Sequence, residues 1–133
     1  MSRPILAIDP GREKCGVAVL ATDGHILVQE VVRTKTLADV VGALAAEYEP
    51  HIIMGNGTTS AAAKACVEAL GRTVTLIDEY RTTDAAKLLY WEMHPPHGWR
   101  CFIPRGMLVP PVPVDDFVAV ILARRFLREK MSD

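Results

Sequence analysis

The sequence has few cysteines, and none of them forms a recognisable pair. Cys15, Cys66 and Cys101 are an odd number and include no Cys-x-x-Cys motif. This pattern argues against a disulfide framework and against a zinc site built from thiolates. We therefore expect free thiols in a reducing compartment.

Long apolar runs are also missing. No run approaches the roughly 20 residues that a helix needs to span a bilayer. The first residues, Met-Ser-Arg-Pro-Ile-Leu, lack the longer apolar core and the small-residue cleavage site of a signal peptide. We expect a cytoplasmic protein that does not bind a membrane.

The chain has no large excess of charge of either sign. Its net charge is −1, whereas many nucleic-acid-binding domains are clearly basic. If several acids gather in a metal site, the remaining surface is more positive than the total suggests, so the net charge leaves nucleic-acid binding open. The hydrophobic fraction is 50% over 133 residues, which is typical of a single folded domain with its own core.

The periodicity of the apolar residues predicts an α/β domain. Asp23-Gly24 is a strong hairpin signal, and Thr36 with Asp39 resembles a capping box at a helix start. The proline-rich residues 95–113 are predicted to form an irregular loop. The expected strands are residues 5–9, 16–21, 25–32, 51–55 and 74–79, and the expected helices are residues 37–48, 60–70, 83–93 and 115–130.

The order of these elements predicts one mixed five-stranded sheet with helices on both faces. The first three strands follow one another through short loops, as in an antiparallel meander. The later strands alternate with helices, which implies parallel strands joined by right-handed crossovers. We expect residues 1–133 to form a single domain.

Acidic residues stand at the ends of three expected elements. Asp9 ends the first strand, Glu79 ends the fifth, and Asp115 and Asp116 begin the last helix. Groups at the carboxyl ends of parallel strands face a common crevice, and the last helix can add a carboxylate from the side. Oxygen ligands without thiolates suit Mg²⁺ or Mn²⁺. Taken singly, each acid is better explained as turn or capping chemistry, and the placement of the acids at three element ends that one sheet can bring together is what favours a metal site.

Three motifs at these acids resemble one known family. Residues 5–19, Ile-Leu-Ala-Ile-Asp-Pro-Gly-Arg-Glu-Lys-Cys-Gly-Val-Ala-Val, resemble the opening of the YqgF (RuvX) and RuvC branch of the ribonuclease H superfamily. Residues 78–83, Asp-Glu-Tyr-Arg-Thr-Thr, resemble the Asp-Glu-x-x-Thr-Thr motif of YqgF proteins, and Asp116 with Ala119 resembles their closing Asp-x-x-Ala.

The resemblance implies a ribonuclease-H-like fold and a role for three residues. Asp9, Glu79 and Asp116 are implied to be catalytic, metal-binding acids. Helical periodicity alone does not choose between Asp115 and Asp116, and the spacing to Ala119 favours Asp116. The other aspartate is then expected to cap the helix or to assist at the metal.

Five further residues are candidates for contacts with nucleic acid. Arg12, Lys14 and Arg81 lie in loops beside the acids, where they can hold phosphates without identifying the base sequence. Thr58 and Ser60 belong to a stretch of glycines and hydroxyls before a helix, and backbone N–H groups at a helix start bind phosphate. The alternative is a flexible connection with Ser60 as the helix cap.

These features favour a metal-dependent nuclease over two other functions. The first expectation is two-metal hydrolysis of structured RNA, with the resemblance pointing to precursor 16S ribosomal RNA. The second is an endonuclease that resolves four-way (Holliday) DNA junctions, which needs a homodimer so that two sites cut opposing strands. The third is a non-catalytic protein that binds a nucleotide or nucleic acid, because actin-like ATPases share the superfold. The sequence leaves monomer and homodimer open.

Overall fold

The structure is a computed structural model that describes the chain except for residues 1–2, 58, 79–81, 95–114 and 133. The described strands are β1 (Ile5–Asp9), β2 (Lys14–Leu20), β3 (Ile26–Arg33), β4 (His51–Gly55) and β5 (Val74–Ile77). The helices are α1 (Leu37–Tyr48), α2 (Ser60–Glu68), α3 (Thr82–Met93) and α4 (Asp115–Ser132), and a short 3₁₀ turn, η1 (Thr34–Thr36), leads into α1.

The five strands form one mixed sheet in the order β3-β2-β1-β4-β5. β1 pairs antiparallel with β2, and β2 pairs antiparallel with β3. β4 lies parallel to β1 on its other side, and β5 lies parallel to β4. The predicted mixed α/β sheet of an antiparallel meander followed by parallel strands is therefore confirmed.

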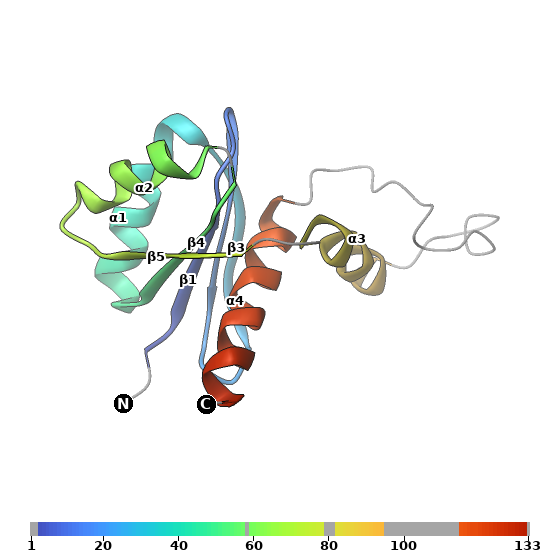
Figure 1. Cartoon of the computed structure of the whole chain (residues 1–133). Helices are drawn as coiled ribbons and strands as arrows, with labels where there is room; N and C mark the ends of the chain where they lie inside the picture. Colours follow the sequence, from blue (N-terminus) through green and yellow to red (C-terminus); the bar gives the residue numbers. More distant parts are fainter. Residues whose placement is uncertain (1–2, 58, 79–81, 95–114, 133) are drawn as a thin grey trace.

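Helices cover both faces of the sheet (Figure 1). One core lies between the sheet and α1 with α2, and the other lies between the sheet and α4, against which α3 packs. Successive strand residues point to opposite faces, and β2 follows this rule. Cys15 and Val17 belong to the α1 core, whereas Ala18 and Leu20 belong to the α4 core.

The hairpin between β2 and β3 forms where Asp23-Gly24 predicts it. The Asp23 carboxylate accepts a hydrogen bond of 2.9 Å from the backbone N–H of His25. Gly24 adopts a positive φ of 92°, which a residue without a side chain adopts at little cost. The turn signal in the sequence is confirmed by both features.

Thr36 occupies the predicted N-cap position of α1, but the capping box is wrong there, and so is the alternative of Ser60 as the cap of α2. The chain enters α1 through η1, so Thr36 has φ −103° and ψ 2° instead of the extended conformation of a usual N-cap. Its hydroxyl donates to the carbonyl of Arg33 at 2.9 Å, and the capping box with Asp39 does not form. At α2 the cap position is Thr59, and Ser60 is already the first helical residue.

Where element ends differ from the prediction, they differ by one or two residues. β2 begins at Lys14, and α2 ends at Glu68. The fifth strand ends at Ile77, before the predicted Glu79, which lies outside the described residues. The proline-rich residues 95–113 also lie outside them.

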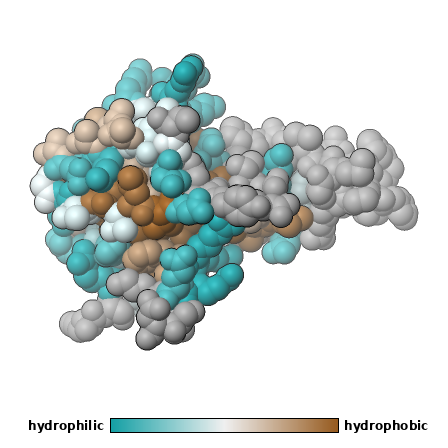
Figure 2. Space-filling view, viewed as in Figure 1, coloured by the Kyte–Doolittle hydropathy of each residue, from teal (hydrophilic) through white to brown (hydrophobic). Residues whose placement is uncertain are grey.

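β5 forms one edge of the sheet. Figure 2 shows apolar residues at the surface beside this strand, among hydrophilic neighbours. Leu76 of β5 is 41% exposed. Over the described part of the chain, every helix is too short or too polar to cross a membrane.

Candidate functional site

Asp9 lies at the end of β1 on the side of the sheet that α4 covers. Ile5 and Ala7, four and two residues earlier in the same strand, both belong to the α4 core. Because strand residues alternate between faces, Asp9 shares this face. It is half-buried, and its Cα partner on β2 is Gly16.

Gly16 brings the start of α4 next to Asp9. A Cβ atom on Gly16 would overlap the carbonyl group of Asp115 and would lie 2.8 Å from the amide nitrogen of Asp116. The first peptide of α4 therefore lies directly on β2 at Gly16, the residue that pairs with Asp9. A glycine inside a strand commonly marks such a close backbone approach. The backbone thus places Asp9 and the start of α4, with Asp115 and Asp116, at the same end of one sheet face.

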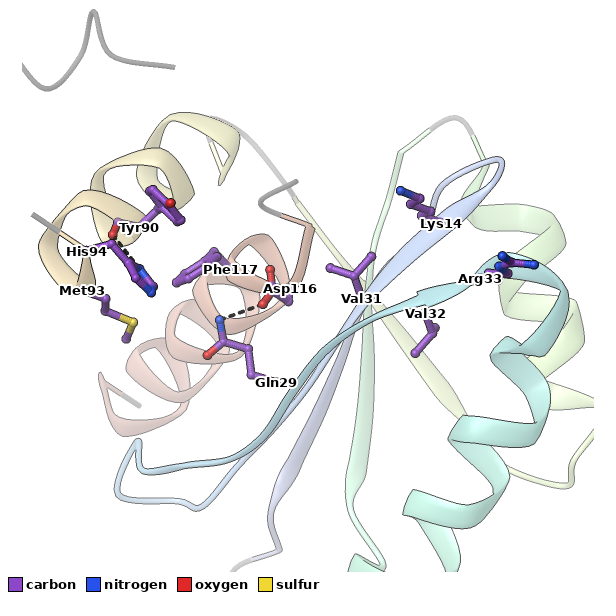
Figure 3. Close-up of a pocket in the computed structure, with 10 residues that line it drawn as sticks. All are labelled: Lys14, Gln29, Val31, Val32, Arg33, Tyr90, Met93, His94, Asp116 and Phe117. Carbon is purple, nitrogen blue, oxygen red and sulfur yellow. Dashed lines mark hydrogen bonds between the residues drawn. The ribbon is translucent and has the colours of Figure 1, made fainter. Parts of the chain in front are cut away.

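Asp116 is held by one hydrogen bond and keeps one buried oxygen. Nε2 of Gln29, on β3, donates to Oδ2 of Asp116 at 3.0 Å (Figure 3). Oδ1 of the same carboxylate is buried, and no donor among the described residues reaches it. A buried carboxylate oxygen without a partner is unfavourable, so this atom is a candidate ligand for a cation.

The surroundings of Asp115 disfavour the charged form of its carboxyl group. Burial raises the pKa of its carboxyl, the neighbouring Asp116 carboxylate raises it further, and the ammonium group of Lys14 partly lowers it. Two carboxylates in the first turn of a helix gain from the macrodipole but repel one another. A divalent cation would relieve that repulsion.

Asp115→Asn is expected to stabilise the fold at neutral pH when divalent cations are absent. The pKa of Asp115 is higher in the folded than in the unfolded protein. The stability linked to this group is fully present below the unfolded pKa of about 3.9 and is lost as the pH rises through the folded pKa. The free energy of unfolding of the variant, relative to wild type, should therefore increase from about pH 4 toward neutral pH, measured by urea unfolding in EDTA.

The matched control for this experiment is Asp39→Asn. It removes an exposed carboxylate from the first turn of α1, where the macrodipole favours a negative charge. This variant should not become more stable than wild type. If the free energies of unfolding of wild type and Asp115→Asn change with pH in parallel, the pKa of Asp115 is not raised in the folded protein.

The loop after Asp9 is tied to the end of β3. The hydroxyl of Thr34 donates to the carbonyl of Gly11 at 2.9 Å, and the backbone N–H of Thr34 donates to the carbonyl of Glu13 at 2.8 Å. A Cβ atom on Gly11 would overlap the carbonyl oxygen of Lys14, so the loop is tight. These contacts fix the direction in which the chain leaves β1.

The predicted phosphate-binding residues are only partly within the described chain. Arg12 is exposed in the loop between β1 and β2, and Lys14 is exposed at the start of β2. Ser60 is 8% exposed at the start of α2. Thr58 and Arg81 lie outside the described residues. The role of all five in phosphate binding stays a prediction.

A complete metal centre is not assembled from the described residues alone. Within residues 3–57, 59–78, 82–94 and 115–132, no group of three or more His, Cys, Asp or Glu side chains could hold a metal ion. Asp9, Asp115 and Asp116 all lie within these ranges without forming such a group, and the third predicted acid, Glu79, is outside them. Binding of Mg²⁺ or Mn²⁺ therefore stays a prediction.

Two features of the site were not predicted from the sequence. Gln29, which binds Asp116, is a half-buried polar residue in the otherwise apolar part of β3. Gly16 is a glycine inside the predicted second strand, and this signal alone points to a close approach of another backbone. The sequence does not say which backbone, because α4 begins about a hundred residues later.

Comparison with known proteins gives no family for this chain. No family model and no curated protein matches the sequence. Among solved structures the chain is similar to the ethanolamine utilization protein EutJ from Carboxydothermus hydrogenoformans, with a TM-score of 0.41 and 18% identity. The match covers 61% of this chain and 39% of that protein, so the chain spans less than half of its length. A likeness this low transfers neither a fold family nor an activity.

The family predicted from the motifs is corrected by these findings. The expected YqgF and RuvC branch is wrong, because no family model matches the sequence. The motifs that suggested it are short and lie at strand ends and helix starts. Asp-Pro-Gly after a strand and aspartates at a helix start recur in unrelated proteins as turns and caps, so their order was not specific enough.

Proposed function

We propose that this chain hydrolyses phosphodiester bonds in nucleic acid with divalent cations, Mg²⁺ or Mn²⁺, held by Asp9, Asp116 and Glu79. The observation that supports it most is the contact of Gly16 with the first peptide of α4. Through this contact, acids that are over a hundred residues apart in sequence share one end of one sheet face. A purely structural role for Asp9 and Asp116 would not require that convergence.

The chemistry of these residues fits a divalent cation. Carboxylate oxygens are the ligands that Mg²⁺ and Mn²⁺ prefer. Oδ1 of Asp116 is buried and lacks a donor among the described residues, and the negative charge of Asp116 raises the pKa of Asp115. When bound, such ions supply charge stabilisation to the attacking and leaving oxygens of a phosphodiester and lower the pKa of water.

The surrounding residues orient the acids and the substrate. The amide of Gln29 fixes the Asp116 carboxylate through Oδ2, which leaves Oδ1 for a cation. Thr34 fixes the loop that follows Asp9. Lys14 is exposed close enough to Asp115 to lower its pKa, so its ammonium group can bind a phosphate beside the acids.

The sheet itself is proposed to be ribonuclease-H-like in architecture. The support is an antiparallel meander of β1, β2 and β3 in which β1 also pairs with the parallel strand β4, with helices on both faces of the sheet. This architecture serves both nucleases and actin-like ATPases, so it does not decide the reaction. The choice of precursor ribosomal RNA depended on the motif resemblance, and the substrate is therefore left to experiment.

The deciding experiment is a cleavage assay with several substrates. Structured ribosomal RNA precursor and a four-way DNA junction are each incubated with the protein in Mg²⁺, in Mn²⁺ or in EDTA. We expect cleavage that requires the cation and that disappears in Asp9→Asn. The control Asp39→Asn, in an exposed position on α1, should cleave like wild type.

The substrate that is cut identifies the type of nuclease. Cleavage of the RNA favours an RNA-processing enzyme, and paired cuts in the junction favour a dimeric resolving enzyme. ATP binding is measured separately. If the protein binds ATP but cleaves neither the RNA nor the junction, the result would contradict the proposal and favour a nucleotide-binding protein.

A further inference from the structure

A cavity of about 840 Å³ opens beside Asp116 (Figure 3). It lies between β2 and β3 on one side and the C-terminal end of α3 on the other. Because α4 begins above Gly16, it does not extend over the residues at the adjoining ends of β2 and β3. Lys14, Val31 and Arg33 therefore line the cavity from the sheet side.

Two cations stand side by side at the sheet end of this cavity. Lys14 and Arg33 are Cα partners on antiparallel strands, and both are exposed. Like charges directly opposite one another destabilise a sheet. Arg33 forms no ion pair with a carboxylate of the described residues. An anion bound between the two would remove the repulsion.

The other end of the cavity is aromatic and apolar. The ring of His94 stacks on Tyr90 with centroids 4.7 Å apart, and the ring of Phe117 meets Tyr90 edge-on at 5.7 Å. Met93 is 44% exposed beside them, and its thioether adapts to flat rings. Aromatic faces of this kind stack on unpaired bases.

We propose that this cavity binds one unpaired nucleotide of a single strand, with its phosphate at Lys14 and Arg33 and its base against His94 and Met93. The volume lies within the range of about 300–1,000 Å³ typical of small-molecule sites, which suits a single nucleotide and excludes a duplex. The inference rests on the proposed function and narrows it, because the nucleotide would lie next to Asp116. The substrate is then a strand with an unpaired nucleotide at the cleavage site.

The test measures binding in EDTA, so that affinity is separated from cleavage. Fluorescence anisotropy compares a labelled single-stranded oligonucleotide with the same sequence in a blunt duplex. We expect the single strand to bind at least about tenfold more tightly, because stacking on each base is available only when it is unpaired. His94→Ala should weaken binding of the single strand by about tenfold.

Arg33→Ala gives a second, electrostatic measurement. It should weaken binding of the single strand and lower the slope of log K against log salt concentration by about 0.7, the value for one phosphate contact in a single strand. The matched controls are Arg72→Ala, which removes an equal charge next to Glu49 on another part of the surface, and His25→Ala, in the hairpin at the opposite end of β2. Both controls should bind like wild type.

The outcomes separate this inference from the proposed function. Equal binding of single strand and duplex, or equal losses in Arg33→Ala and Arg72→Ala, would overturn the nucleotide cavity. If these binding results fail while Asp9→Asn still abolishes cleavage, the nuclease proposal stands alone. If Arg33→Ala and His94→Ala lose single-strand binding but no substrate is cut, the cavity stands and hydrolysis is wrong.

Discussion

Replacing Asp116 with asparagine is expected to slow cleavage by more than about 100-fold while the protein remains folded. Loss of an outer partner of a metal ligand alone costs about 10- to 100-fold, and this change removes the charge of the ligand itself. The carbonyl oxygen of the asparagine can still accept the hydrogen bond that Gln29 donates. Cleavage rates and circular dichroism of the two proteins provide the measurement.

Gln29→Ala tests the same site with a smaller expected effect. It leaves the Asp116 charge in place but removes the hydrogen bond that orients it, so a loss of about 10- to 100-fold is expected. Thermal unfolding adds a reading that does not depend on cleavage. Mn²⁺ at about 100 times its dissociation constant should stabilise wild type by about 2.7 kcal/mol and Asp116→Asn much less. If Asp116→Asn cleaves the substrate at the wild-type rate, Asp116 is not part of the catalytic site.

Gly16→Ala is expected to destabilise the protein by about 1–3 kcal/mol, the usual cost of forcing an extra group into a packed region. The added Cβ would overlap the carbonyl of Asp115. That atom belongs to the backbone of α4, so it cannot rotate away as a side chain would, and the helix must shift. Urea unfolding measures the loss, and cleavage should fall as well because the shift separates Asp116 from Asp9.

A second glycine provides the control for this substitution. Gly42 lies within α1, and the nearest atom to an added Cβ is the Leu70 side chain at 3.9 Å. Gly42→Ala should therefore stabilise the protein by roughly 0.5–1 kcal/mol, the helix preference of alanine over glycine. If Gly16→Ala unfolds at the same urea concentration as wild type, the close contact between β2 and α4 is not as described.

The elements of the fold were predictable because their signals are local. The apolar run of β1 and the spacing of apolar residues in α1 gave bounds that agree with the structure. Thr36 is the N-cap residue of α1, but the capping box was wrong, because the chain enters α1 through a 3₁₀ turn. No sequence pattern distinguished that entry from a capping box.

The site was predictable only in part. Asp9 was predicted at the end of the first strand, but its neighbours come from long-range contacts. Gln29 and Arg33, on β3, and His94, directly after α3, surround the site. Nothing in their local sequence marks them. The family prediction failed for a related reason. Short motifs at element ends are set by local turn and cap geometry, so unrelated proteins can share them.

The alternation of small and large residues along β2 also restricts how its length can vary. Gly16 and Ala18 lie under α4, whereas Val17 and Val19 fill the opposite core. A one-residue insertion or deletion within the strand would exchange these two sets, setting valines against the helix backbone and leaving voids beneath α1. Length changes in this part of the chain are therefore confined to the hairpin at residues 21–25, at the end of the strand far from Lys14.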